Sequence, residues 1–186
     1  LIMNNPSLLT NIITPSVSLN KVTLLLNADY SSLLYMQPFW KGGLGFGYLK
    51  LGLDSKLFLE TDASGFITSN NFNVSSTAYI LSYGQKMKIL KKNAQFGFAL
   101  KLLNHQVGKY SASGYSTMFD FTYNLKQKFY LAHSISNLIG GNIGDDKLPL
   151  RLKNTLNYEI LDKLVLSPEL EILAGRFDYR LGAKYK

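Results

Sequence analysis

Apolar and polar residues alternate strictly along most of this chain. From Tyr115 to Leu125 the odd positions are aromatic, Leu or Thr, whereas the even positions are polar or Met. The segments 94–102, 150–160 and 177–185 follow the same pattern. A period of two places each set of side chains on its own face of a strand, whereas a helix would spread the charges around its circumference. The pattern therefore predicts strands with one apolar face each.

The alternating segments predict about ten strands. They cover residues 16–26, 30–39, 43–54, 74–84, 93–106, 115–125, 128–137, 150–161, 164–173 and 176–185. Several alternate over about 9–11 residues, which is the length that a tilted strand needs to cross a bilayer. Strands of soluble proteins usually run about 5–6 residues. The second face carries Gly, Thr, Asn and charged residues, which suits a polar lumen better than the dry interior of a sandwich.

The connections between these segments differ in length. Tight joints are expected at 41–42, 88–92, 126–127 and 162–163. Longer connections are expected at 55–73, 107–114 and 139–149, with 174–175 as a short exception. Short turns at one end and long loops at the other are typical of bacterial outer-membrane barrels, whose long loops face outward. The sequence thus predicts an all-β fold, an antiparallel transmembrane up-and-down β-barrel in the bacterial outer membrane.

The first residues differ from the rest of the chain. Residues 1–15 contain several Asn and Pro residues, and they predict a turn-rich lead-in or a short helix that plugs the mouth of the barrel. The region 16–186 then holds the barrel strands, and no linker divides it into two domains.

Composition narrows the class of protein. The chain of 186 residues is 46% hydrophobic and 13% aromatic, yet it has no run of about 18 uncharged apolar residues that would form a transmembrane helix. It has no Cys, so disulfides and zinc–thiolate sites are excluded. The net charge of +8 is compatible with anionic lipid or nucleic acid. The aromatic residues fit membrane girdles better than base stacking. The expected girdle residues are Phe39, Trp40 and Tyr130 near the tight turns, and Tyr115 and Phe58 near the loops. Lipid is therefore the expected partner, and nucleic acid is not.

Two motifs permit ligand chemistry. The run Gly42–Gly47 resembles a phosphate loop, but its glycines alternate within a strand and no helix follows, so small lumen-facing residues are favoured. Asp145 and Asp146 are candidate calcium ligands, but the spacing of a calcium loop is missing, and a solvated turn is favoured.

No catalytic or metal site is predicted. His105 and His133 lie on different segments without a partner at ligand spacing. Glu159, Glu169 and Glu171 form either an acid cluster or, more simply, a lumen network of ion pairs with the basic residues on neighbouring polar faces. Those basic residues are Arg151, Lys153 and Arg180. The serines lack the context of a nucleophile, so the chain is not expected to be an enzyme or to bind a cofactor.

Several stretches resemble the PorV/PorQ-type outer-membrane proteins, whose fold is related to the FadL transporters. The similar stretches are Asn4–Leu9, Val17–Leu19, Gly42–Tyr48, Gly97–Leu103, Gly108–Gly114, His133–Leu138 and Leu148–Asn154. They follow the order that they have in that family and cover nearly the whole chain. The glycine that follows the Asn-Leu pair in the family is displaced here to Gly140.

The resemblance implies a non-catalytic role. PorV-type members receive and pass on secreted surface proteins, which implies a docking partner for such proteins. The alternative is a FadL-like transporter of hydrophobic small molecules. The partner is expected at the outer loops, and the candidate residues are Phe58, Phe66, Phe72, Tyr110, Asp145 and Asp146.

The family also has more strands, commonly about fourteen, which lies within the range of bacterial barrels. An unpaired sheet edge in hydrocarbon leaves backbone groups unsatisfied at several kcal/mol each. The first and last segments, near 16–26 and 177–185, would therefore need to pair. We expect either further strands or a second chain at these edges.

Overall fold

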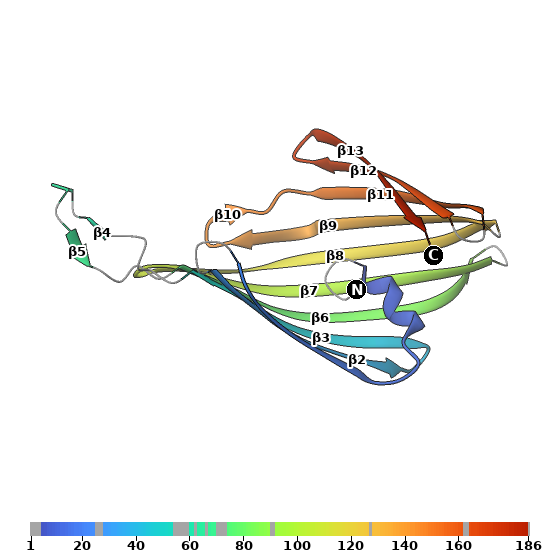
Figure 1. Cartoon of the computed structure of the whole chain (residues 1–186), viewed down its shortest axis with the longest axis horizontal. Coiled ribbons are helices and arrows are strands. Elements are labelled where there is room, and N and C mark those ends of the chain that lie inside the picture. Colours follow the sequence, from blue (N-terminus) through green and yellow to red (C-terminus); the bar gives the residue numbers. More distant parts are fainter. Residues whose placement is uncertain are drawn as a thin grey trace.

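A computed structural model describes residues 5–24, 28–53, 60–61, 63–65, 67–69, 74–89, 92–126, 128–161 and 164–185. Almost all of its regular structure is strand (Figure 1). Within these residues the one helical element is a short 3₁₀ helix, η1 (Pro6–Asn11). None of the helices in the described part of the chain is long and apolar enough to span a membrane.

Ten strands follow one another in a single path, and every neighbouring pair is antiparallel. They are β1 (Ser16–Thr23), β2 (Ala28–Phe39), β3 (Gly42–Leu53), β6 (Val74–Ile89), β7 (Lys92–Val107), β8 (Tyr110–Lys126), β9 (Phe129–Ile143), β11 (Arg151–Leu161), β12 (Leu164–Leu173) and β13 (Arg176–Tyr185). The short β10 (Asp146–Lys147) pairs with β9, and β4 (Glu60–Thr61) pairs with β5 (Ile67–Ser69). The predicted all-β, antiparallel, up-and-down order is confirmed.

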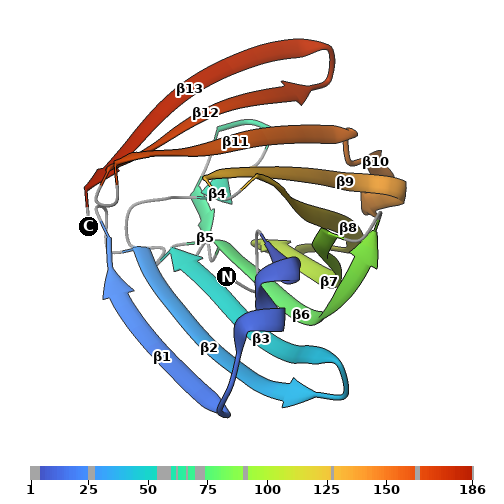
Figure 2. The same cartoon turned by 90° about the vertical axis from the view of Figure 1, so that its right-hand side faces the viewer.

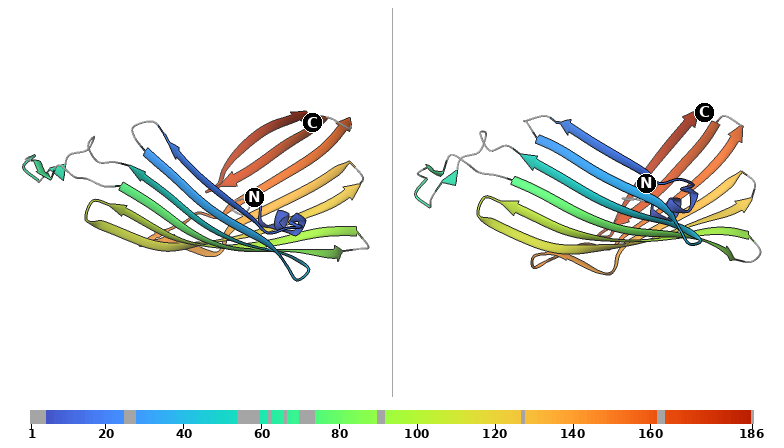
Figure 3. Two further views of the ribbon diagram at one scale, coloured as in Figure 1. Left: turned by 60° about the horizontal axis from the view of Figure 1, so that its bottom comes forward. Right: turned by 90° about the horizontal axis from the view of Figure 1, so that it is seen from below.

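The sheet curls around η1, as the end-on view in Figure 2 shows. The two further views in Figure 3 show the same trough, with β1 and β13 as its edges. In the described part of the chain, β1 pairs only with β2 and β13 only with β12. The trough is thus open, and the closed barrel and the expected cover for its edges stay predictions.

Register places the alternating side chains on two distinct faces. One row across the convex face runs through Phe98, Phe119, Ile135, Leu152, Ile172 and Phe177. Among charged residues of the sheet whose side chains the structure describes, only Lys21, Asp29, Lys50 and Lys147 share this face. All four lie toward the end of the sheet that holds the β7–β8 turn, which we call the loop end; the opposite end is the turn end. Segregation this complete leaves a broad uncharged convex band.

Three expected details differ from the structure. The loop expected at 107–114 is the tight turn Gly108–Lys109, because β7 and β8 continue to Val107 and from Tyr110. The loop expected at 139–149 begins later, because β9 continues to Ile143 beyond a bulge. Tyr130 was expected in an aromatic girdle, but its pairing with Asn124 and Asn157 places it on the concave face.

The bulge in β9 lies opposite Thr117. Ser116 pairs with Gly141 and Met118 with Ser136, which leaves 137–140 without ladder partners. Asn137 has φ +62° and Gly140 has φ +90°. The Asn137 side chain accepts a hydrogen bond from Ser116 Oγ (2.7 Å) and donates one to the Pro149 carbonyl (2.9 Å). These bonds fix the bulge and the path from β9 to β11, since they replace the missing ladder bonds.

Candidate functional site

Three glycines on the concave face form the seat of η1. Gly43, Gly84 and Gly97 are consecutive register partners on β3, β6 and β7. A Cβ atom would lie 2.3 Å from the Leu9 carbonyl oxygen at Gly43, and 2.1 Å from the Ser7 nitrogen at Gly97. At Gly84 it would lie 2.4 Å from the Pro6 carbonyl oxygen. The helix backbone therefore rests directly on the strand backbones, an approach that only glycine permits.

Asp120 continues the glycine row on β8 and holds the start of η1. It pairs with Gly97, and its side chain is 2% exposed. The Ser7 N–H donates to Asp120 Oδ2 (3.0 Å), and Ser7 Oγ lies 3.0 Å from Thr122 Oγ1. The first backbone N–H groups of a helix have no partner within it, and a carboxylate is a strong acceptor for them. Leu9 completes the seat by packing on Ile80.

The same row becomes charged beyond Asp120. It passes through Ser134 on β9, Lys153 on β11 and Glu171 on β12. Glu171 is buried and lies 2.5 Å from Arg151 Nε and 3.3 Å from Arg180 Nη1. Lys153 Nζ lies 2.8 Å from Glu169 Oε2. We call Arg151, Lys153, Glu169, Glu171 and Arg180 the charge ladder of β11–β13.

The charge ladder confirms the predicted ion-pair network for two of its three acids. Glu169 and Glu171 face the basic residues that were expected to neutralise them. Glu159 lies on the same face near the turn end of β11, opposite Val165. These ion pairs neutralise one another's charges on the concave face of β11–β13.

Two cavities flank the seat of η1. A polar cavity of about 160 Å³ separates η1 from the charge ladder, and Asn5, Asp120, Lys153 and Glu169 are among its lining residues. An apolar cavity of about 260 Å³ lies toward the loop end. Its lining includes Tyr30, Leu49, Leu51, Ala78, Leu103 and Ile143. The concave face thus contains an apolar cavity. The polar residues that the sequence places on this face of the last strands did not lead us to expect it.

Three of the expected partner-binding residues lie together at the loop end. Tyr110 begins β8 at the β7–β8 turn and is 81% exposed. Asp145 lies in the exposed turn between β9 and β10, and the exposed Asp146 begins β10. The β9–β10 turn is hydrogen-bonded to the first part of β8, because the Gly144 N–H donates to the Ser113 carbonyl (2.9 Å). Phe58, Phe66 and Phe72, the other three expected residues, lie outside the described residues.

The two histidines lie on opposite faces. His105 Nδ1 is 2.7 Å from Ser76 Oγ on the concave face. His133 is hydrogen-bonded to Asn154 on the convex face, where it pairs with Phe121. In the described part of the chain, no group of three or more His, Asp or Glu residues is placed to hold a metal ion.

The seat of η1 was missed in the sequence, although its parts were visible. The alternation predicts that the glycines of β3 are small lumen-facing residues, but it does not connect Gly84, Gly97 and Asp120 with them. The available signal was a carboxylate within the alternating segment 115–125 and a proline-led segment with no strand pattern. Joining them needs the register between strands, because the contacts are more than 30 residues apart in sequence.

Comparisons with known protein families, with curated proteins and with solved structures find no match to this chain. The resemblance to the PorV/PorQ family therefore stays a prediction.

Proposed function

We propose that this chain is an outer-membrane strand protein that docks a secreted or surface protein on its loop end. The observation that carries the proposal is the extra length of the central strands. β6, β7, β8 and β9 run for 15 to 17 residues, whereas a crossing needs about 9–11. At the loop end, the additional residues include 104–107 of β7 and 110–113 of β8. They extend beyond the uncharged convex band, and we call this polar extension the ledge.

The ledge has the composition of a wet surface. On its convex side the ladder continues through Asn104 with Ser113 and Gln106 with Ser111. Tyr110 and the turn of Asp145 and Asp146 lie at its end. Exposed tyrosine on a fixed scaffold is a common anchor in protein interfaces, because its ring buries a large area at a small entropic cost. These features favour a protein partner over a passive loop.

The test is capture of a partner from native envelopes in mild detergent. The ledge variant combines Tyr110→Ala, Asp145→Asn and Asp146→Asn; the matched control changes Trp40→Ala, an exposed aromatic residue at the turn end. A stoichiometric protein that the native chain and the control retain, and the ledge variant loses, supports docking. Equal retention by all three contradicts docking at this ledge.

One observation favours a second function, the uptake of hydrophobic small molecules. The apolar cavity beside Leu103 opens on the concave face, and the bulge at 137–140 interrupts the β8–β9 wall beside Ile143. Apolar cavities of this kind bind lipophilic ligands. A fluorescent long-chain fatty acid tests it: Ala78→Phe should fill the cavity and weaken binding, and Leu131→Phe on the convex face should not. Equal binding by both variants contradicts this function.

A further inference from the structure

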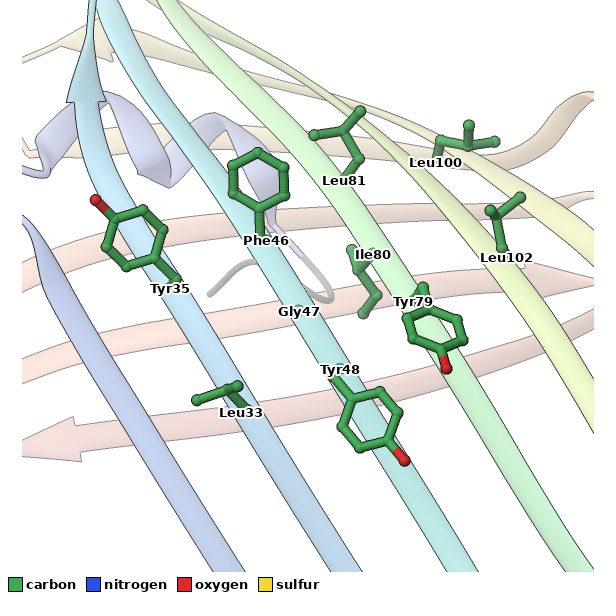
Figure 4. A pocket seen from close by; sticks show the side chains of 10 residues that line it. All are labelled: Leu33, Tyr35, Phe46, Gly47, Tyr48, Tyr79, Ile80, Leu81, Leu100 and Leu102. Carbon is green, nitrogen blue, oxygen red and sulfur yellow. The ribbon is translucent and has the colours of Figure 1, made fainter.

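The convex face has a groove with no role in the proposed docking. It has a volume of about 370 Å³ and lies across β2, β3, β6 and β7 (Figure 4). Two register rows supply its walls: Leu33, Tyr48, Tyr79 and Leu102 in one, and Tyr35, Phe46, Leu81 and Leu100 in the other. The backbone at Gly47 and Ile80 forms the floor, while Ile80 itself packs on Leu9 behind the sheet.

The aromatic side chains give the groove its shape. The rings of Tyr48 and Tyr79 are 5.3 Å apart, and those of Tyr35 and Phe46 are 6.5 Å apart and nearly parallel. Three of the four leucines, Leu33, Leu81 and Leu102, are about half exposed. All the lining side chains are apolar or aromatic, and the volume is in the range of sites that hold a small molecule, about 300–1,000 Å³.

A basic row borders the groove on its loop side. Lys50 follows Tyr48 on the same face of β3, about 7 Å along the strand. Its register row contains Ser31 on β2, Thr77 on β6 and Lys21 on β1. Lys21 and Lys50 are two strands apart, about 10 Å. Both are exposed, and neither forms an ion pair with a described residue.

The only described acid near this row on the convex face already has a partner. Asp29 accepts a hydrogen bond from Thr23 Oγ1 (2.8 Å), one step further toward the loop end. The row therefore offers two ammonium groups and two hydroxyl groups directly above an apolar groove. That order, from apolar wall to tyrosine to lysine, matches a lipid from its hydrocarbon to its headgroup.

We propose that the groove binds one acyl chain of an anionic phospholipid, whose phosphate lies at Lys50 beside Ser31 and Thr77. The inference rests on the proposed membrane placement but is independent of the docking partner. Within a bilayer the groove gains no hydrophobic preference for one lipid, because all lipid tails are apolar. The preference for an anionic headgroup comes from Lys50 and Lys21.

The test uses the full chain in nanodiscs of phosphatidylglycerol and phosphatidylcholine in equal amounts. Native mass spectrometry of the released protein measures the ratio of the two lipids that stay bound. Lys50→Gln should reduce the excess of phosphatidylglycerol about fivefold, since one surface lysine contributes ~1 kcal/mol to anionic lipid binding. The matched control Lys109→Gln removes the same charge at the β7–β8 turn and should leave the ratio unchanged.

A second pair of variants tests the groove itself. Leu81→Trp fills it and should reduce the number of retained lipids of both kinds; Ile135→Trp, on the convex face of β9 outside the groove, should not. Equal lipid ratios for the native chain and Lys50→Gln overturn the headgroup assignment. Equal retention by the two Trp variants overturns the groove. A chain that does not enter the nanodisc overturns the membrane placement, and with it this inference. That outcome is distinguishable from failure of the headgroup assignment and from failure of the groove, because both of these are measured on protein in nanodiscs.

Discussion

The first and last strands of the sheet share a convex face but differ on the concave one. Around η1, the concave face from β2 to β8 is mostly glycine, small and aliphatic residues, and it holds η1 against Gly43, Gly84 and Gly97. Lys86, Lys88 and Lys101 also lie on this face. From β11 to β13 the same register rows carry the charge ladder. One half packs a segment of its own chain, and the other neutralises its own charges.

The difference shows that the convex face is uniform along the sheet, whereas the concave face is not. The convex face keeps an apolar band whatever lies behind it, as the row from Phe98 to Phe177 illustrates. The concave face changes its chemistry between neighbouring strands at Asp120, which pairs with Gly97 on one side and Ser134 on the other. A uniform environment outside the trough and two different ones inside account for this division.

The largest effect is expected from a charge placed in the apolar convex band, which both halves share. Phe119→Arg places a charge in the apolar band beside Phe98, whose ring is 5.1 Å away. Leu152→Arg does the same in the second half, in the same row. Each should lower the free energy of unfolding by about 2–4 kcal/mol if the row lies at the bilayer midplane.

Denaturant titration of protein folded in lipid vesicles measures both losses. Gln106→Arg, on the convex side of the ledge, is the control and should cost less than about 1 kcal/mol. A large loss in one half alone would contradict a common lipid-facing band.

The next effect belongs to the glycine half. Gly97→Ala puts a methyl group into the backbone of η1 and should displace the helix, at a cost of about 1–3 kcal/mol for overpacking. Gly52→Ala is the matched control, because a Cβ there meets no atom within 4 Å. Limited proteolysis should cut residues 6–11 in the Gly97 variant only. Equal protection in both variants would show that η1 is not held by this seat.

The smallest effect belongs to the charged half. Glu171→Gln removes the buried charge that Arg151 and Arg180 share. We expect a loss of about 1–2 kcal/mol, toward the low end for a buried charged partner, because both arginine side chains are about half exposed and stay hydrated. Asp178→Asn removes an exposed acid from the same region and should cost less than about 1 kcal/mol. Thermal unfolding in detergent compares them; equal losses would contradict a special role for the buried acid.

Local pattern and long-range register contributed differently to what the sequence could predict. The bounds of β12 and β13 agree with the predicted segments 164–173 and 176–185, because apolar and charged residues alternate there with strong contrast. The turn at Gly108 was missed because the Ser, Ala and Gly residues that follow it have little contrast between faces. The seat of η1 depends on three strands in register, and no local pattern encodes register.

The charge ladder, in contrast, could be predicted from local pattern. Its acids and bases lie on strands that follow each other closely, and period-two alternation already placed them on one face. The bulge at 137–140 could not be predicted in this way. It depends on Asn137 adopting a positive φ that its side-chain hydrogen bonds stabilise. Hydrogen bonds to distant residues decide that conformation.

The central claim is that the convex face meets lipid and the concave face does not. Nitroxide labels placed one at a time at positions 115–123 of β8, in reconstituted vesicles, test it directly through their accessibility to oxygen and to a water-soluble nickel complex. The odd positions, including Phe119 and Phe121, should be accessible to oxygen and protected from nickel. The even positions, including Asp120, should be protected from oxygen. Odd positions that nickel reaches as readily as Tyr110 on the ledge would contradict the account.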